Sequence, residues 1–413
     1  MKNNLNNVRN NWGDYINPHP AVMVVAKRPE ITFVKGKGSW LWDNTGKAYL
    51  DFVQGWAVNC LGHSPDILLE AITRQASELI HAGPGFFNAP MLQLSDALVA
   101  HSCFDQVFFT NSGAEANEGA IKLARKWGSV HKQGAYEMIT LQNGFHGRTL
   151  ATMSASGKAE WESLYAPKVS GFVKVPQNDI DAMRAAINNN TVAIMLEPIQ
   201  GESGVHPASH AYLQGVRELA DEHGVLLIFD EVQTGMGRTG TLFAYEQSGV
   251  QPDVMTLGKG LGGGVPLGAM LIKKEFACFE PGDQGGTFNG NPLMTAAGFA
   301  ILNALVAPGF PEQVKAKGAM LAEGLQTLSA RYGLGEVRGC GLLLALDCAA
   351  IAAAEVVDQM FSLGALVNAP RAHTLRFMPA LNVQKSDIEH FLSMLEQAFA
   401  SVIEKHAVKG ECA

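Results

Sequence analysis

The sequence predicts an α/β protein with a large, mainly parallel sheet and a smaller α+β domain formed by both chain ends. Between residues 106 and 264, short apolar runs that end in Gly-rich or polar turns alternate with helical patterns. Near-continuous apolar strands of this kind are typical of a parallel sheet that helices cover on both faces. At 413 residues the chain also exceeds one ordinary core, which favours two domains.

The first expected element is a small antiparallel sheet. The stretch GKGSWLWDNTGKAYLDF, residues 36–52, contains two Gly/Asn-type turns between alternating apolar pieces. The strand–turn–helix units of the large sheet follow this stretch, and they cover residues 106–127, 136–149, 191–204, 225–240 and 254–264.

The pattern changes after about residue 301. Amphipathic helices are expected at 314–332 and 387–406, and they surround short strands in GLLLALD and LRFMPAL. We therefore expect two domains, a large one over 61–300 and a small one formed by 1–60 with 301–413.

Composition and charge make several classes of partner poor candidates. The formal net charge is −8, the isoelectric point is about 5.8, and no Lys/Arg block occurs, so neither nucleic acid nor an anionic membrane is expected to bind. No run of ~18 uncharged apolar residues predicts a membrane span. The polar, Asn-rich start lacks the apolar run of a secretory leader, which favours a cytoplasmic protein. The cysteines are scattered without a C-x-x-C pair or a His cluster, so no metal site is expected.

Polar residues that follow the apolar runs are the site candidates, because ligands of open α/β sheets bind beyond the carboxyl ends of the strands. LLIFDEVQTGMGRTG places Asp230 directly after a strand, where an unpartnered carboxylate would be unfavourable. Asp230 could cap the next turn. It could also keep a pyridinium nitrogen protonated so that the ring acts as an electron sink. Gln233 could then reach the phenolic oxygen of that ring.

The stretch VMTLGKGLGGGVPLGAM contains one lysine, Lys259, among six glycines. A Walker-type phosphate loop requires Ser or Thr after the lysine, and Gly260 stands there instead. A dinucleotide G-x-G-x-x-G match is weak because no clear helix follows. A flexible loop remains open, and so does a lysine that attacks a carbonyl. Such a lysine must be neutral to react, and burial favours the neutral form because it lowers the pKa of an amine.

Two further motifs could contact a flat, phosphorylated ligand. In FTNSGAEAN, a helix begins after Ser112, so its first N–H groups at Gly113 and Ala114 could bind phosphate; Ser112 could equally be a plain helix cap. In NGFHGRT, Phe145 could stack on a ring and Arg148 could hold a carboxylate bidentately. An isolated phenylalanine at such a position is more often part of the core.

Taken together, the motifs specify one ligand. A phosphate anchor, a stacking aromatic, a carboxylate for a ring nitrogen and a lysine for a carbonyl all follow strands of the same chain. These are the groups that pyridoxal 5′-phosphate (PLP) requires.

The same motifs resemble those of the class III PLP-dependent aminotransferases, and the similarity extends from about residue 17 to residue 400. The resemblance implies PLP-dependent transferase fold type I with a seven-stranded sheet in the large domain. The motifs that carry it are NSGAEANEGAIKLARKW, FHGRT, EPIQGESGV, FDEVQTGMGRTG, TLGKGLGGGVPLGA, GGTFNGNPL and LRFMPALNV.

The resemblance implies roles at the cofactor. Lys259 would form the covalent link to PLP and act as general base, while Asp230 would pair with the pyridine nitrogen. Thr287 would contact the phosphate in the other subunit, which makes a homodimer the minimal active unit. The remaining implied cofactor contacts are Ser112, Gly113, Ala114, Phe145, His146, Val232 and Gln233.

The resemblance also implies a substrate class, and FHGRT with LRFMPALNV points to the branch that acts on N2-acetylornithine. Arg148 would bind the carboxylate of that substrate, and Arg376 would bind the α-carboxylate of glutamate. Glu202 would neutralise an arginine when a substrate has no carboxylate there. Family members often have Gly-Ser-Thr where this chain has Gly-Gly-Thr, so only a backbone contact from Gly286 is expected.

The implied reaction moves the δ-amino group to 2-oxoglutarate in arginine biosynthesis. Succinylornithine, ornithine, an N-succinyldiaminopimelate precursor and 4-aminobutyrate remain alternative substrates, and a non-catalytic PLP-binding regulatory protein is an alternative of another class. Pro18 stands where ornithine aminotransferases carry a tyrosine, which favours an N-acylated substrate. Residues 1–16 carry no interpretable pattern.

Overall fold

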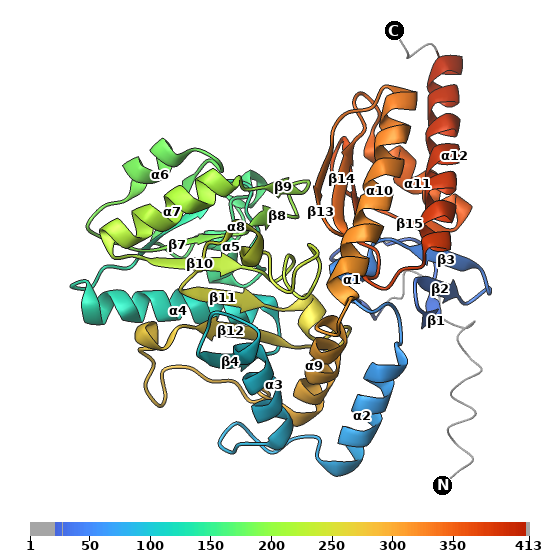
Figure 1. The fold of residues 1–413 in the computed structure, drawn as a ribbon. Helices are drawn as coiled ribbons and strands as arrows, with labels where there is room; N and C mark the ends of the chain where they lie inside the picture. The colour runs from blue at the N-terminus through green and yellow to red at the C-terminus, as the bar shows by residue number, and fades with distance from the viewer. Residues whose placement is uncertain (1–20, 27, 410–413) are drawn as a thin grey trace.

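A seven-stranded sheet forms the centre of the larger lobe (Figure 1). The spatial order is β4-β12-β11-β10-β7-β5-β6, and only β12 runs antiparallel to its neighbours. The strands are β4 (Gln106–Thr110), β5 (Glu137–Leu141), β6 (Phe172–Val175), β7 (Thr191–Leu196), β10 (Leu226–Asp230), β11 (Val254–Leu257) and β12 (Gly268–Ile272). Every residue of β7 and β10 is buried, which explains their continuous apolar sequences. The predicted fold class is confirmed.

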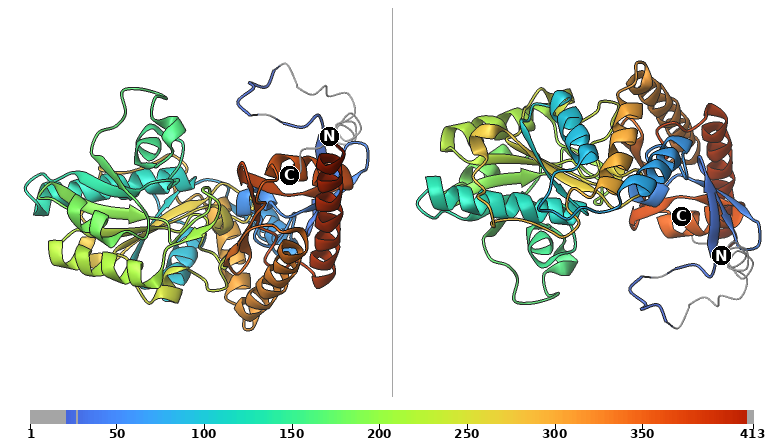
Figure 2. Two further views of the ribbon diagram at one scale, coloured as in Figure 1. Left: turned by 90° about the horizontal axis from the view of Figure 1, so that it is seen from above. Right: turned by 90° about the horizontal axis from the view of Figure 1, so that it is seen from below.

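Helices lie on both faces of this sheet, as Figure 2 shows from above and below. Ser112 caps α4, because its side chain accepts a hydrogen bond from the Glu115 amide. The helices of this lobe are α2 (Asp66–Glu78), α3 (Ala89–Ala100), α4 (Gly113–His131), α5 (Leu150–Ala155), α6 (Ile180–Ala186), α7 (His210–His223), α8 (Tyr245–Ser248) and α9 (Pro292–Leu305), with 3-10 turns η2 (Ala159–Trp161), η3 (Lys259–Leu261) and η4 (Lys274–Phe276). A short hairpin joins β8 (Ile199–Gln200) to β9 (His206–Pro207).

The second lobe combines the two ends of the chain. The antiparallel strands β1 (Phe33–Lys37), β2 (Trp40–Asp43) and β3 (Ala48–Asp51) are completed by β15 (Ala365–Leu366), which pairs with β3. The other strands of this lobe form a sheet in the order β13 (Val337–Cys340), β14 (Leu343–Asp347), β17 (Thr374–Phe377) and β16 (Asn368–Arg371). Its helices are α1 (Gln54–Ala57), α10 (Phe310–Tyr332), α11 (Ala353–Leu363) and α12 (Lys385–Lys409). The helix α9 runs across residue 300, so the expected domain boundary falls inside a helix.

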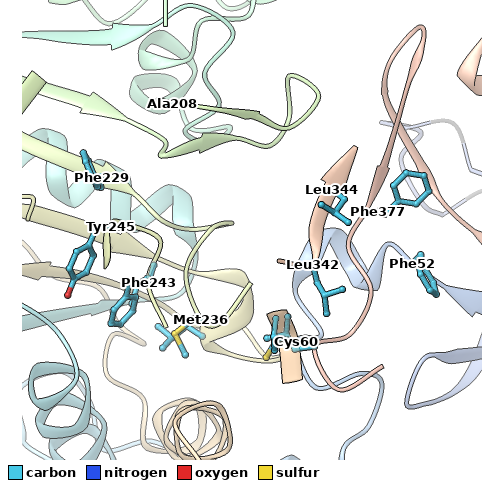
Figure 3. Close-up of a cluster of buried hydrophobic side chains, with 14 of the residues drawn as sticks. Phe52, Cys60, Ala208, Phe229, Met236, Phe243, Tyr245, Leu342, Leu344 and Phe377 are labelled. Carbon is cyan, nitrogen blue, oxygen red and sulfur yellow. The ribbon is translucent and has the colours of Figure 1, made fainter. Parts of the chain in front are cut away.

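One hydrophobic cluster connects the two lobes (Figure 3). Phe229 on β10 belongs to the large sheet, and Phe377 on β17 belongs to the small lobe. Met236, Cys60 and Leu342 lie between them and are all buried. A continuous apolar contact of this kind fixes the two lobes relative to each other, so side chains from both can build one site.

The computed structural model describes residues 21–26 and 28–409. Pro18, the tail 1–16 and Cys412 lie outside these residues, and the five cysteines that are described are free. Among the described helices, none is by itself long and apolar enough to cross a membrane. Only α9 and α10 together, across a bend of 74°, match a span in length and composition.

Candidate active site

A cavity of about 280 Å³ lies at the carboxyl ends of β5, β10 and β11. Most of the predicted site residues line it. They are Gly113, Ala114, Phe145, His146, Arg148, Glu202, Asp230, Val232, Gln233 and Lys259. The cavity is also lined by Asn117, Gly147 and Glu197, which the sequence did not single out.

Asp230 is buried and held from several sides. Its Oδ2 accepts hydrogen bonds from Asn117 Nδ2 and from His146 Nδ1, both at 2.8 Å, and its Oδ1 accepts one from the Val232 amide at 3.0 Å. Thr256 in turn donates to Asn117 Oδ1 at 2.6 Å. A carboxylate with these fixed donors keeps its orientation and stays available to an acidic N–H in the cavity.

His146 and Glu197 extend this buried network. Burial disfavours a charged imidazole, but the hydrogen bond and the negative charge of Asp230 outweigh burial and raise the pKa of His146. Burial raises the pKa of Glu197 to about 7, and its Oε1 accepts a hydrogen bond from the Phe145 amide at 2.8 Å. Asp230 therefore lies in a buried network with two other titratable side chains, His146 and Glu197.

Lys259 closely follows β11 and lies partly buried in the cavity wall. Burial lowers the pKa of its amine, and Arg376 lowers it further, against the opposing effect of Glu202. Its backbone has φ of 42°, a conformation that non-glycine residues rarely adopt. A neutral amine in a constrained position is what attack on a carbonyl requires.

The start of α4 forms a cradle that fits the phosphate of PLP. The amides of Gly113 and Ala114 face the cavity and donate no hydrogen bond to any described residue. A Cβ on Gly113 would lie 2.6 Å from Val232 Cγ1, and one on Gly258 would lie 3.0 Å from the Gly113 backbone. Glycine is thus required for the close packing that leaves two free N–H groups at a helix N-terminus, a favourable anion site.

Ser112, Thr287 and Gly286 do not line this cavity. The Ser112 hydroxyl caps α4, and Thr287 lies exposed in the loop 285–290. That loop contacts the rest of the chain at its other residues: Asn289 Oδ1 accepts a hydrogen bond from Asn111 Nδ2 at 3.1 Å, and the Gly290 carbonyl accepts one from Asn88 Nδ2 at 2.9 Å. Any contact of Thr287 or Gly286 with a cofactor would therefore involve another copy of the chain, and this expectation stays a prediction.

Arg376, on β17 in the small lobe, is fully buried and lies behind the cavity wall, against the lining residues Glu202 and Gln233. Its Nη1 donates to Glu202 Oε1 at 2.9 Å and to Gln233 Oε1 at 3.2 Å. Its Nε and Nη2 both donate to Asn368 Oδ1, at 3.0 and 2.8 Å. The ring of Trp56, in a left-handed turn over Gln54–Ala57, lies 5.7 Å from the guanidinium carbon.

The ion pair changes the acid strength of Glu202. Burial alone would raise the pKa of this carboxyl, but the positive charges of Arg376 and Lys259 lower it to about 2. Glu202 is therefore ionised at any physiological pH, and it neutralises Arg376. A substrate carboxylate can reach Arg376 only by replacing Glu202.

Arg148 is exposed and also lines the cavity. No hydrogen bond or ion pair to another described residue holds its guanidinium, whose carbon lies 5.2 Å from the centre of the Trp161 ring. The cavity thus has a neutralised arginine and an unneutralised one.

Sequence reasoning missed several residues around the site. Asn117 lies near the start of α4, and Trp56 and Trp161 lie in the short elements α1 and η2, so none of them directly follows a strand. Among these missed residues, Glu197 carried a usable sequence signal, because it directly follows the fully buried strand β7. Asp230 stands in a similar place, as the last residue of the fully buried strand β10.

Comparison with known proteins agrees with this geometry. The chain matches the family model "aminotransferase class-III" over residues 22–399. It is 56% identical to acetylornithine aminotransferase 2 of Bordetella bronchiseptica over 92% of this chain and 97% of that protein. The solved N-acetylornithine aminotransferase of Stenotrophomonas maltophilia K279a is 37% identical, with a TM-score of 0.80 over 92% of this chain and 98% of that one. A Toxoplasma gondii ornithine aminotransferase with partially occupied PLP in its active site is 32% identical, with a TM-score of 0.90 over 94% and 93% of the two chains.

Proposed function

Because this chain belongs to the class-III aminotransferases, we propose that it transfers the δ-amino group of N2-acetyl-L-ornithine to 2-oxoglutarate. The products are N-acetyl-L-glutamate 5-semialdehyde and L-glutamate. The enzyme uses PLP, as its family does. The names of the relatives in Bordetella and Stenotrophomonas support the substrate, and arginine biosynthesis in the cytoplasm is the proposed setting.

One observation carries this proposal: two arginines of the site have different partners. Glutamate reacts through its α-amine, so its α-carboxylate is attached to the reacting carbon and its second carboxylate lies further away. N-acetylornithine reacts through its δ-amine, so its carboxylate is remote and no carboxylate lies beside the reacting carbon. Arg376 influences Lys259 electrostatically and is neutralised by Glu202, whereas Arg148 stays free for a remote carboxylate of either substrate.

The charges near Arg148 are mixed, with a positive excess. Burial is the largest cause of the lowered pKa of Lys158; Glu202 and Glu160 oppose it, and Arg371 and Arg148 add to it. Because Glu202 is already paired with Arg376, the cations outnumber the remaining acid, and an N-acyl group removes the α-ammonium charge of ornithine that they would repel. The same cations would attract the extra carboxylate of a succinyl group, which makes N2-succinylornithine the second candidate substrate.

The chain's residues divide the chemical work. Bound PLP supplies an electron sink for the substrate carbon that carries the amino group. Lys259 would hold the cofactor covalently, and once the substrate amine has displaced it, its free neutral amine would remove the proton from that carbon. Asp230 would keep the pyridine nitrogen protonated, and the amides of Gly113 and Ala114 would bind the phosphate. Phe145 would lie against the ring.

A homodimer is part of the proposal. Thr287 and Phe288 are exposed in the loop 285–290 rather than packed against their own cavity. We therefore assign this loop to the phosphate site of a partner subunit, with Thr287 as the contacting residue and Gly286 as a backbone donor near the substrate.

Steady-state kinetics with a panel of amines test the proposal. N2-acetylornithine is expected to give the highest kcat/KM with 2-oxoglutarate, N2-succinylornithine a comparable or lower value, and ornithine or 4-aminobutyrate values at least ~10-fold lower. Lys259→Ala should bind PLP without the visible absorbance of the covalent lysine adduct and should lose turnover. Equal or better turnover of ornithine would contradict the proposed substrate, and PLP binding without turnover of any amine would favour a regulatory protein.

A further inference from the structure

The guanidinium of Arg148 has little to hold it in place. Its side chain is exposed, and among the described residues it makes no hydrogen bond or ion pair. A long side chain of this kind loses rotamer freedom when it binds a carboxylate, which weakens binding. The contact that can restrict its conformations is the indole of Trp161, 5.2 Å from the guanidinium carbon. Stacking of this planar cation on an aromatic face is favourable.

Trp161 is itself firmly placed. It ends the 3-10 turn η2, with its amide bonded to the Lys158 carbonyl at 3.0 Å. It is only 7% exposed although the residues that follow it, 162–166, are exposed. Its ring meets Phe145 edge to face, with 5.7 Å between the centroids and 61° between the planes. The indole therefore anchors an otherwise exposed loop and connects Arg148 to Phe145, which lines the cavity.

A second cation uses the same pair of rings. The ammonium of Lys158 lies 5.1 Å from the centroid of Phe145 and 5.1 Å from that of Trp161. Its charge interacts with that of Arg148 and with the opposing charges of Glu202 and Glu160. Trp161 thus contacts two cations, Arg148 and Lys158, rather than simply filling space.

We propose that Trp161 is a positioning residue that holds Arg148 ready for the remote carboxylate of both substrates. This proposal rests on the proposed function, because it takes Arg148 as the carboxylate-binding group. Trp161 touches neither the reacting carbon nor Lys259 in this scheme, so it should affect binding more than the chemical step.

The test compares Trp161→Leu, Trp161→Phe and Trp161→Tyr in the PLP-loaded enzyme. Trp161→Leu should raise KM about tenfold for both N2-acetylornithine and 2-oxoglutarate and change kcat less than about twofold. The aromatic variants should recover most of the loss. Trp42→Leu is the matched control, since Trp42 has Lys35 over its ring at 4.8 Å but lies on β2, away from the cavity.

A double-mutant cycle separates positioning from a general loss of structure. In an Arg148→Ala background, Trp161→Leu should cause no further rise in KM. Glutarate has two carboxylates and no reacting group, so calorimetry can measure its Kd without turnover. Trp161→Leu should raise this Kd in the wild-type background and leave it unchanged in the Arg148→Ala background. A thermal melt checks that each variant is folded, and Trp161→Met, which also removes the aromatic face, provides the test if Trp161→Leu is not folded.

The outcomes distinguish two failures. If Arg148→Ala leaves KM for both substrates unchanged, the proposed role of Arg148 is wrong, and the role of Trp161 fails with it. The positioning role alone is overturned if Arg148→Ala raises KM but Trp161→Leu does not. It is also overturned if Trp161→Leu raises KM as much in the Arg148→Ala background as it does in the wild-type enzyme. A tenfold fall in kcat at unchanged KM would also overturn it.

Discussion

The two arginines of the site occupy opposite environments. Arg376 is fully buried and donates hydrogen bonds to a carboxylate, two side-chain amides and a backbone carbonyl. Arg148 is exposed and lies against one indole ring. The buried arginine is preorganised but already neutralised, so a substrate must compete with Glu202. The exposed arginine has no competing acid, but it depends on packing for its orientation.

This difference matches the demands of a reaction with two amine donors of unequal shape. In the proposed reaction, Arg376 would bind a carboxylate in one half-reaction and none in the other, and Glu202 would be its counter-ion when the substrate has no carboxylate there. Arg148 would bind a carboxylate in both half-reactions, so a counter-ion there would only weaken binding.

The largest expected effect comes from removing the buried arginine. Arg376→Ala should lower kcat/KM for 2-oxoglutarate about 1000-fold, because a desolvated, charge-paired contact worth about 4 kcal/mol is lost. The rate with N2-acetylornithine in a single half-reaction should fall far less. Stopped-flow half-reactions measure both. Arg217→Ala is the control, because it removes a partly buried ion pair with Asp253 outside the cavity, and it should change neither rate. Equal losses with both substrates in Arg376→Ala would contradict the division of roles.

The two arginines should also differ in their effect on folding. Arg376→Ala leaves Glu202 without its partner inside the protein, so the free energy of unfolding should fall by about 3 kcal/mol. Arg148→Ala removes an exposed side chain and should change it by less than about 0.5 kcal/mol. Denaturant titration of the whole protein measures these values. Similar losses of unfolding free energy in Arg376→Ala and Arg148→Ala would show that the environments of the two arginines differ less than their contacts indicate.

The contribution of Glu202 to stability should depend on pH. Its pKa is lowered from 4.5 to about 2 in the folded protein, so its stabilising effect is fully present above about pH 4.5. The effect is lost as the pH falls from 4.5 towards 2, because the unfolded chain then binds the proton more readily. Urea titrations of wild type and Glu202→Gln over this range should converge at the acid end; a constant difference would argue against the ion pair.

Removing the counter-ion should favour the dicarboxylate substrate. In Glu202→Gln, Arg376 no longer has a competing charge, so KM for 2-oxoglutarate should fall about tenfold, a change of about 1.4 kcal/mol. The half-reaction with N2-acetylornithine should become slower, because Arg376 then carries an uncompensated charge. Glu160→Gln is the control for an exposed carboxylate near Lys158; a rise in KM for 2-oxoglutarate in Glu202→Gln would refute the competition.

The smallest effect is expected at Lys158. Its ammonium is partly exposed and lies against two rings without a hydrogen bond to a described residue. Lys158→Met should therefore raise KM for both substrates about threefold, and added salt should reduce the difference. Initial rates at low and high ionic strength measure this. An effect as large as that of Arg148→Ala would mean that Lys158 binds the carboxylate directly.

The sequence predicted the parts of the site that follow local rules. Lys259, Asp230 and Gly113 each stand at or just after the end of an apolar strand, and parallel strands end at one edge of the sheet. Contiguous motifs are therefore enough to place these three residues in the same region. The same rule also applies to Glu197, which directly follows the buried strand β7.

The sequence by itself thus determined the fold class and the PLP dependence, and it predicted Lys259 as the lysine that would hold the cofactor. Only the tertiary structure decided which charges are paired. Glu202 and Arg376 are 174 residues apart, and Asn117 and Asp230 are 113 apart. No residue spacing encodes such contacts, because they arise when distant segments of the chain pack against each other and bury the polar groups together. The physical state of each group, ionised or neutral and held or free, is set by that burial.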